Sequence, residues 1–256
     1  MKPIFAIAKL LIKEIFRKKD FYVALILIAV ILFYSSQLRF YNVENVVRYL
    51  MDLGLMLIFY FSVILTVALA ARQYPSEIQN RTCQVLLAKP IGRGQFVLGK
   101  YCGSLFAGMA CFAVFYAVFL VMIWPKSPSI SAGVAVETLY LFCLNLAVVS
   151  AMAGALSYFL TTSANVSVTL VLYLLITTYG SGLKESSRHL FWMNRFLGEG
   201  FYYLLPHFEF FDMRQRFVHH WGSVPLSLVF FLTAYAAAYV AVFLLIAWLK
   251  LKKAFL

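Results

Sequence analysis

The sequence predicts an all-α integral membrane protein with six transmembrane helices. Hydrophobic residues make up 63% of the 256-residue chain and charged residues 12%, and the mean hydropathy is +0.86, far outside the range of soluble globular domains. Six apolar runs are long enough to cross a hydrocarbon core of about 30 Å as helices. They fall near residues 21–38, 50–71, 96–124, 136–161, 165–183 and 224–249, within a single transmembrane domain over 1–256. A transmembrane β-barrel would instead show short segments of alternating polarity.

Residues 1–20, before the first run, are predicted to form an amphipathic helix in the cytoplasmic membrane interface. Apolar residues from Ile4 to Ile15 recur at helical spacing, and basic residues from Lys9 to Arg17 fall on the opposite face. The alternative is a simple extension of the first span. A signal peptide is disfavoured because the apolar run is too long and no A-x-A-like cleavage site follows it.

The distribution of Lys and Arg predicts that both termini face the cytoplasm. Basic residues concentrate before span 1, between spans 2 and 3, and after span 6, whereas the connection between spans 3 and 4 carries only Lys126. The formal net charge of +12 then reflects orientation and attraction to anionic lipid headgroups. We do not expect nucleic-acid binding, because no segment forms a basic groove in water.

Few ionisable residues fall within the predicted spans. Asp52 and Glu137 lie at the outer ends of spans 2 and 4, and Lys100 lies at the inner end of span 3. Ion-coupled carriers usually keep such groups inside the membrane, so we expect the energy to come from a partner. The mid-membrane polar groups, expected to join helices through hydrogen bonds, are Asn145, Ser150, Thr169 and Thr177.

The four cysteines form no C-x-x-C pair and are expected to be packing residues, neither in disulfides nor at a zinc site; they are Cys83, Cys102, Cys111 and Cys143. Gly94, Gly99 and Lys100 match G-x-x-x-x-G-K, but Tyr101 replaces the magnesium-binding Ser or Thr and bulky residues fill the spacing, so the match is interpreted as chance. Gly99 and Gly103 instead form G-x-x-x-G, which allows close helix packing.

The polar stretch 72–94 between spans 2 and 3 is predicted to contain a short cytoplasmic helix. Pro75 and Ser76 are suited to a helix start, Glu77 suits the positive end of the helix dipole, and Lys89-Pro90 ends the helix. Its apolar face comprises Ile78, Thr82, Val85 and Leu86. The helix either packs back on the protein or docks into a cytoplasmic partner.

This stretch resembles the six-span permeases of ABC-2-type ABC transporters. Their segment after span 2 commonly reads (S/G)-E-x-x-x-G-T, an aliphatic run, P-(I/V/L)-x-R and a G-K pair. This chain has Ser76-Glu77, Thr82, Val85-Leu86-Leu87, Pro90-Ile91, Arg93 and Gly99-Lys100 in that order. Arg81 stands where the family usually has Gly. The run at 90–95 with Leu98-Gly99-Lys100 is also similar to permeases of the nitrous-oxide-reductase maturation type.

The resemblance implies a dimer of permease chains above two separate ATPase subunits, in a bacterial or archaeal plasma membrane. The chain itself would be no enzyme and hold no cofactor, with ATP and magnesium bound by the partner. Residues implied to contact the ATPase are Glu77, Ile78, Arg81, Thr82, Val85, Leu86 and Arg93.

The connection 184–223, before span 6, is rich in aromatic residues and contains all four histidines. Because aromatic rings favour the membrane interface, we expect two short external helices in the outer leaflet, broken near Gly198-Glu199-Gly200 and Pro206. A transition-metal site is an alternative, with candidate ligands His207, Glu209, His219 and His220 together with Met213.

The function expected from these observations is an ATP-driven export permease. A complex that transmits force or signals without carrying a substrate would share the cytoplasmic helix, and remains an alternative. A membrane enzyme or ion-coupled carrier would need an acid, base or nucleophile set inside the spans, and none stands out in the sequence. The apolar pathway and aromatic external roof suit a hydrophobic or amphipathic cargo.

Overall fold

The structure is a computed structural model that describes residues 22–23, 26, 30, 43–79, 93–124, 131–187 and 205–254. The helices of these ranges are α3 (Val43–Gln79), α5 (Arg93–Ile123), α6 (Ala132–Leu156), α7 (Thr162–Ser187), η1 (Phe208–Phe211), α9 (Arg214–Val218) and α10 (Leu226–Ala254). Four of them are long and apolar enough to cross a membrane, over Val47–Arg72, Gly94–Ile123, Ala132–Leu156 and Leu226–Lys252. These four coincide with predicted spans 2, 3, 4 and 6.

The two remaining predicted spans, 1 and 5, are not among the four helices that are long enough to cross the membrane. Span 1 and the interfacial helix over 1–20 lie outside the described residues, apart from four isolated helical positions in span 1. Span 5 corresponds to α7, but the apolar part of that helix, Thr162–Thr178, falls short of the about 20 residues that a perpendicular crossing needs. After Thr178 the helix continues through Gly, Ser, Lys and Glu residues. The six-span count is therefore not established by the described part of the chain.

The start of the cytoplasmic stretch differs from the prediction. α3 runs without interruption through Pro75 to Gln79, so Pro75 does not begin a separate helix. Proline fixes φ near a helical value and removes only its own N–H, and membrane helices tolerate that loss. The rest of the stretch, including Arg81, Thr82, Val85 and Leu86, lies outside the described residues.

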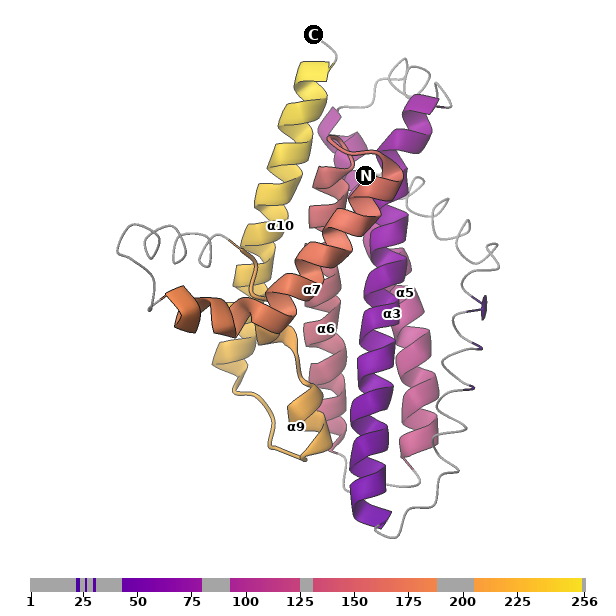
Figure 1. The fold of residues 1–256 in the computed structure, drawn as a ribbon, viewed down its shortest axis with the longest axis vertical. Coiled ribbons are helices and arrows are strands. Elements are labelled where there is room, and N and C mark those ends of the chain that lie inside the picture. The colour runs from indigo at the N-terminus through magenta and orange to yellow at the C-terminus, as the bar shows by residue number, and fades with distance from the viewer. Residues whose placement is uncertain are drawn as a thin grey trace.

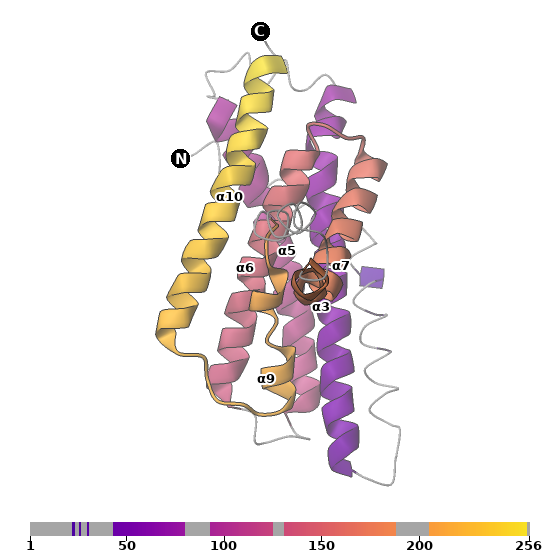
Figure 2. The ribbon, with the colours of Figure 1, turned by 60° about the vertical axis from the view of Figure 1, so that its left-hand side comes forward.

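The long helices run antiparallel in chain order, with α6 at the centre (Figure 1). α6 contacts α3, α5, α7, α10, η1 and α9, and 67% of its most apolar stretch is buried. The end of α3, the start of α5 and the end of α10 lie at one end of the bundle, which we call the α3–α5 end. α7 descends obliquely from that end and stops near mid-height, and α9 lies towards the opposite end in both views (Figures 1 and 2).

Aromatic rings join the elements in the core. Phe59 of α3 stacks on Phe142 of α6 with ring centroids 3.9 Å apart, and both contact Phe112 of α5. Further along α5, Tyr116 donates a hydrogen bond to the Ala135 carbonyl of α6 at 3.0 Å. Tyr116 also contacts Phe217 of α9, so the segment before α10 is part of the same core.

α10 lies on the outside of the bundle, where only 11% of its most apolar stretch is buried. Its exposed side chains are large and apolar, for example Phe230 and Phe231, which are 73% and 63% exposed. Such a helix suits a lipid surrounding, since lipid tails are as apolar as these side chains.

Glycine allows a close helix approach between α5 and α3. A Cβ added to Gly108 would lie 2.2 Å from Thr66 Oγ1, 3.0 Å from its Cγ2 and 3.1 Å from its Cβ. Thr66 is fully buried, and its hydroxyl donates a hydrogen bond to the Ser62 carbonyl at 2.7 Å. Rotating the threonine cannot remove the clash, because all three of its side-chain atoms are close. Gly99 and Gly103, the predicted packing glycines, are buried on the same helix.

Gly108→Ala should therefore lower the thermal stability of the purified protein. Overpacking a tight contact typically costs about 1–3 kcal/mol. The measurement is the midpoint of thermal unfolding in detergent, followed by intrinsic fluorescence. Gly154→Ala in α6 is the matched control, because no atom lies within 4 Å of its added Cβ. Equal midpoints for the two variants would show that α3 and α5 are not in the contact described.

Candidate functional site

A cavity of about 280 Å³ lies between α3, α6, α7 and the η1–α9 segment. It is lined by Phe59, Tyr60, Phe142, Asn145, Tyr173, Thr177, Phe208, Glu209, Asp212, Arg214 and Gln215. Phe59 and Asn145 fall near the middle of the membrane-spanning stretches Val47–Arg72 and Ala132–Leu156. The cavity is therefore close to mid-depth in the bundle, beneath the end of the apolar part of α7.

Two oxygen atoms of the cavity residues are buried without a hydrogen-bond partner. One is Oδ1 of Asn145, a residue only 3% exposed, and the other is Oε1 of Glu209. An unpaired buried polar atom costs about 1–3 kcal/mol, so such atoms usually serve a ligand or an ordered water. Thr177, also predicted to join helices, lines the cavity while its hydroxyl donates to the Tyr173 carbonyl at 2.8 Å.

Of the other two mid-membrane polar residues predicted to join helices, Ser150 does so, whereas the Thr169 hydroxyl forms its hydrogen bond within α7. The Ser150 hydroxyl of α6 is 2.8 Å from the Ser104 hydroxyl of α5. Asn165 Nδ2 of α7 donates to the Ala153 carbonyl of α6 at 2.9 Å, and Thr169 donates to Asn165 Oδ1 at 3.0 Å. These contacts attach α5 and α7 to α6 and leave Asn145 as the polar residue of α6 that faces the cavity.

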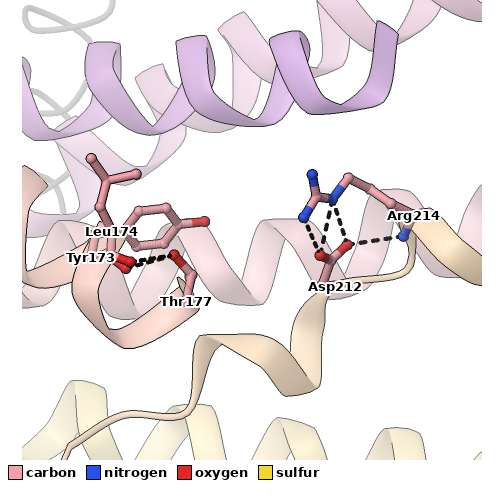
Figure 3. Close-up of polar contacts among 5 residues, drawn as sticks. All are labelled: Tyr173, Leu174, Thr177, Asp212 and Arg214. Carbon is pink, nitrogen blue, oxygen red and sulfur yellow. Dashed lines mark hydrogen bonds and ion pairs between the residues drawn. The ribbon is translucent and has the colours of Figure 1, made fainter. Parts of the chain in front are cut away.

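Asp212 and Arg214 form a tight ion pair at the edge of the cavity. Arg214 donates from Nε to both carboxylate oxygens and from Nη2 to Oδ2 at 2.6 Å, and its backbone N–H donates to Oδ1 (Figure 3). Figure 3 also shows the Tyr173 ring pointing from α7 towards this pair. Hydrogen bonding to Asp212 raises the pKa of Arg214, against the opposing effect of burial. The guanidinium therefore stays charged, and Asp212 compensates it locally.

Two short helices are predicted within the connection 184–223, and in its described part η1 and α9 follow Pro206, but the aromatic side chains of these helices do not form an exposed roof. Phe208, Phe211 and Phe217 are each 1% exposed or less and belong to the bundle core. Residues 188–204 lie outside the described part, and Lys184–Ser187 belong to α7.

Hydrogen bonds hold this segment to its neighbours. Glu137 Oε2 of α6 accepts from the Val224 backbone N–H at 3.0 Å, just before α10. The Tyr235 hydroxyl of α10 is 3.0 Å from both the backbone nitrogen and Nδ1 of His207. Tyr239 of α10 donates to the Leu205 carbonyl at 3.2 Å.

The predicted metal ligands are not brought together among the described residues. His207 is buried against Tyr235 and stacks on Phe210, whereas His219 stacks on Trp221. In the part of the chain that the structure describes, no group of three or more His, Cys, Asp or Glu side chains could hold a metal ion. Glu209 belongs instead to the cavity.

The other predicted site residues are placed as follows. The G-x-x-x-x-G-K match from Gly94 to Lys100 lies within α5, where the backbone N–H groups belong to a helix and not to a phosphate loop. Glu77 and Ile78 are in the last turn of α3, and Arg93 is the first residue of α5. The remaining four implied ATPase contacts, Arg81, Thr82, Val85 and Leu86, lie outside the described residues.

Comparison with known families decides the class of this protein. The family model described as ABC-2 family transporter protein matches residues 5–187, which is more than half of the chain. The chain belongs to the ABC-2 transporter family. It is therefore a multi-pass membrane protein and a permease subunit of an ABC transporter, a class of subunit that is normally not an enzyme and associates with an ABC ATPase. A search of the curated proteins found no match to this ABC-2 permease.

The Asp212–Arg214 pair of the permease should show measurable energetic coupling. Asp212→Asn should lower the unfolding midpoint, because it leaves the Arg214 charge uncompensated, whereas adding Arg214→Gln should recover part of the loss. The side chains are 26% and 33% exposed, so solvent screening limits the coupling energy to about 1 kcal/mol. A double-mutant cycle of unfolding measures it. Additive effects of the two changes would show that the pair is not formed.

Proposed function

We propose that this permease works as a dimer in an ATP-driven exporter with two cytoplasmic ATPase subunits. One ATPase subunit docks on the stretch 72–94 of each permease chain. Membership of the ABC-2 family supports the partnership with an ATPase. The pattern Ser76-Glu77, Thr82, Pro90-Ile91, Arg93 and Gly99-Lys100 supports the docking segment. The Lys and Arg distribution supports a cytoplasmic location for this stretch, and hence for the α3–α5 end.

The observation that carries the proposed mechanism is the length of α3. This single helix contributes Phe59 and Tyr60 to the cavity wall and continues to Gln79, in the proposed docking stretch. The twenty residue steps from Phe59 to Gln79 correspond to about 30 Å of helix at 1.5 Å per residue. A displacement of the docking stretch by the ATPase would therefore move the cavity wall directly, as a rigid element would.

The cavity favours transport over force transmission alone. A complex that only transmits a signal needs no internal space, whereas this bundle keeps a partly polar cavity near mid-depth with two unpaired oxygen atoms. The cavity lining is more polar than the apolar pathway expected from the sequence, so we propose an amphipathic cargo over a purely hydrophobic one.

Val85→Asp should remove the ATPase subunit from the purified complex and abolish the associated ATPase activity, because a charge would have to enter an apolar docking cleft. Glu77→Ala should lower the activity more mildly. The measurement is affinity purification of the tagged chain in mild detergent, with an ATPase assay on the eluate. Lys252→Asp is the control, since it adds acidic charge at the α3–α5 end but outside the stretch. Retention of a fully active ATPase in Val85→Asp would refute the docking assignment.

A second change separates docking from transmission. Replacing Ala70 and Ala71, which lie in α3 before the docking stretch, by two glycines should keep the ATPase bound but uncouple its activity from the cavity, because each glycine weakens a helix interior by about 1 kcal/mol relative to alanine. Wild type, which has alanine at both positions, is the matched control. Ligand-dependent ATPase activity in vesicles measures the effect. Undiminished coupling in the glycine variant would show that α3 is not the transmitting element.

A further inference from the structure

The unpaired atoms of the cavity define the hydrogen-bonding character of its ligand. Asn145 Oδ1 and Glu209 Oε1 are both acceptors, and both are buried without a partner. The Asn145 side chain is 3% exposed and belongs to the cavity lining, so this oxygen has no access to bulk solvent. A group that satisfies both atoms must donate at least two hydrogen bonds.

The charged residues of the cavity indicate the sign of the charge that its ligand carries. Glu209, Asp212 and Arg214 are the charged residues of the described lining. Arg214 is bound to Asp212 by three side-chain hydrogen bonds, and Asp52 of α3 also acts on it electrostatically. The positive charge is thus already compensated, whereas the Glu209 carboxylate has no cationic partner among the described residues. The site suits a cation and disfavours an anion.

The cavity walls define the rest of the ligand. Five of the lining residues are aromatic, namely Phe59, Tyr60, Phe142, Tyr173 and Phe208. Aromatic faces attract cations as well as apolar bodies. A divalent metal fits less well, because hard cations take about six or more oxygen ligands and both Asp212 oxygens already accept hydrogen bonds from Arg214. The volume of about 280 Å³ falls just below the range of about 300–1,000 Å³ typical of drug-sized ligands, so the ligand is small.

We propose that the cavity binds a primary ammonium group carried on a small aromatic or aliphatic body. The ammonium donates hydrogen bonds to Glu209 and Asn145, and the apolar body lies against the aromatic rings. A primary ammonium has three donors and no acceptor, which matches two unpaired acceptors and an uncompensated carboxylate. That such an amine is also the exported cargo rests on the proposed function, whereas the binding itself does not.

The test is isothermal titration calorimetry on the full-length chain, purified in mild detergent with any partner that remains bound. The probe is 2-phenylethylammonium at pH 7, and 2-phenylethanol is its neutral counterpart of the same size. The ammonium should bind at least about tenfold more tightly, as expected for hydrogen bonds to a charged group. Glu209→Gln should remove this difference, because it keeps the shape but not the charge.

Two further variants keep the result decisive. Glu137→Gln neutralises a carboxylate outside the cavity and should leave the difference unchanged. Asn145→Leu is nearly isosteric and should weaken ammonium binding about three- to tenfold, which provides a second readout if Glu209→Gln does not fold.

Water is the competing occupant, since polar cavities commonly hold ordered water. Absence of binding by either probe, equal affinities for both, or a preference for the ammonium that persists in Glu209→Gln would each overturn the proposal. None of these outcomes depends on ATPase activity. A failure of ATPase docking in the Val85→Asp experiment would refute the exporter assignment and leave the ammonium site standing.

Discussion

The structure depends on one constraint of the hydrocarbon environment, which is that polar groups must find their partners within the protein. Most of the buried polar side chains around α6 meet it through short contacts, such as Ser150 with Ser104 of α5 and Asn165 of α7 with the Ala153 carbonyl. Because lipid offers no hydrophobic driving force between helices, these contacts and close packing must hold the bundle together. α6 can therefore occupy the centre of the bundle because groups on α5 and α7 form hydrogen bonds with its buried polar groups.

Among the described residues this rule is not met at Ser62 Oγ of α3 and at two oxygen atoms of the cavity residues. The helices on either side of α6 are fixed by hydrogen bonds and stacked rings. Because the apolar part of α7 stops short of a full crossing, η1 and α9 supply the remaining part of the cavity wall. A wall assembled from a segment outside the spans brings Glu209 and Asp212 to the cavity without placing either of these carboxylates on a spanning helix. This arrangement explains how a chain with few ionisable residues in its spans can still have a polar interior site.

The sequence predicts the features that depend on local pattern and misses those that depend on tertiary packing. Spans 2, 3, 4 and 6 follow directly from apolar length, and the pairing role of Ser150 follows from its polarity in an apolar run. Asn145 cannot be distinguished from Ser150 by such a pattern, because only the arrangement of three helices makes one face a cavity and the other a neighbour. The G-x-x-x-G pattern selects Gly99 and Gly103, but it does not show that Gly108 makes the tight contact with Thr66, because that depends on the register between α5 and α3. The aromatic residues near Phe208 predict a location at the membrane interface, but they do not predict that the rings are buried in the bundle core.

α10 carries apolar side chains around nearly its whole circumference, so contacts with lipid alone do not determine its orientation. Lipid cannot distinguish one apolar side of a helix from another, so the surrounding membrane leaves its rotation about its own axis undetermined. Buried side chains such as Leu232 and Ala236 pack into the core, and the hydrogen bonds of Tyr235 with His207, Tyr239 with Leu205 and Thr233 with Tyr140 add directional contacts that select one rotational setting. Substitutions between apolar residues on the lipid-exposed side of α10 are thus neutral for its orientation, whereas loss of these hydroxyl groups is not.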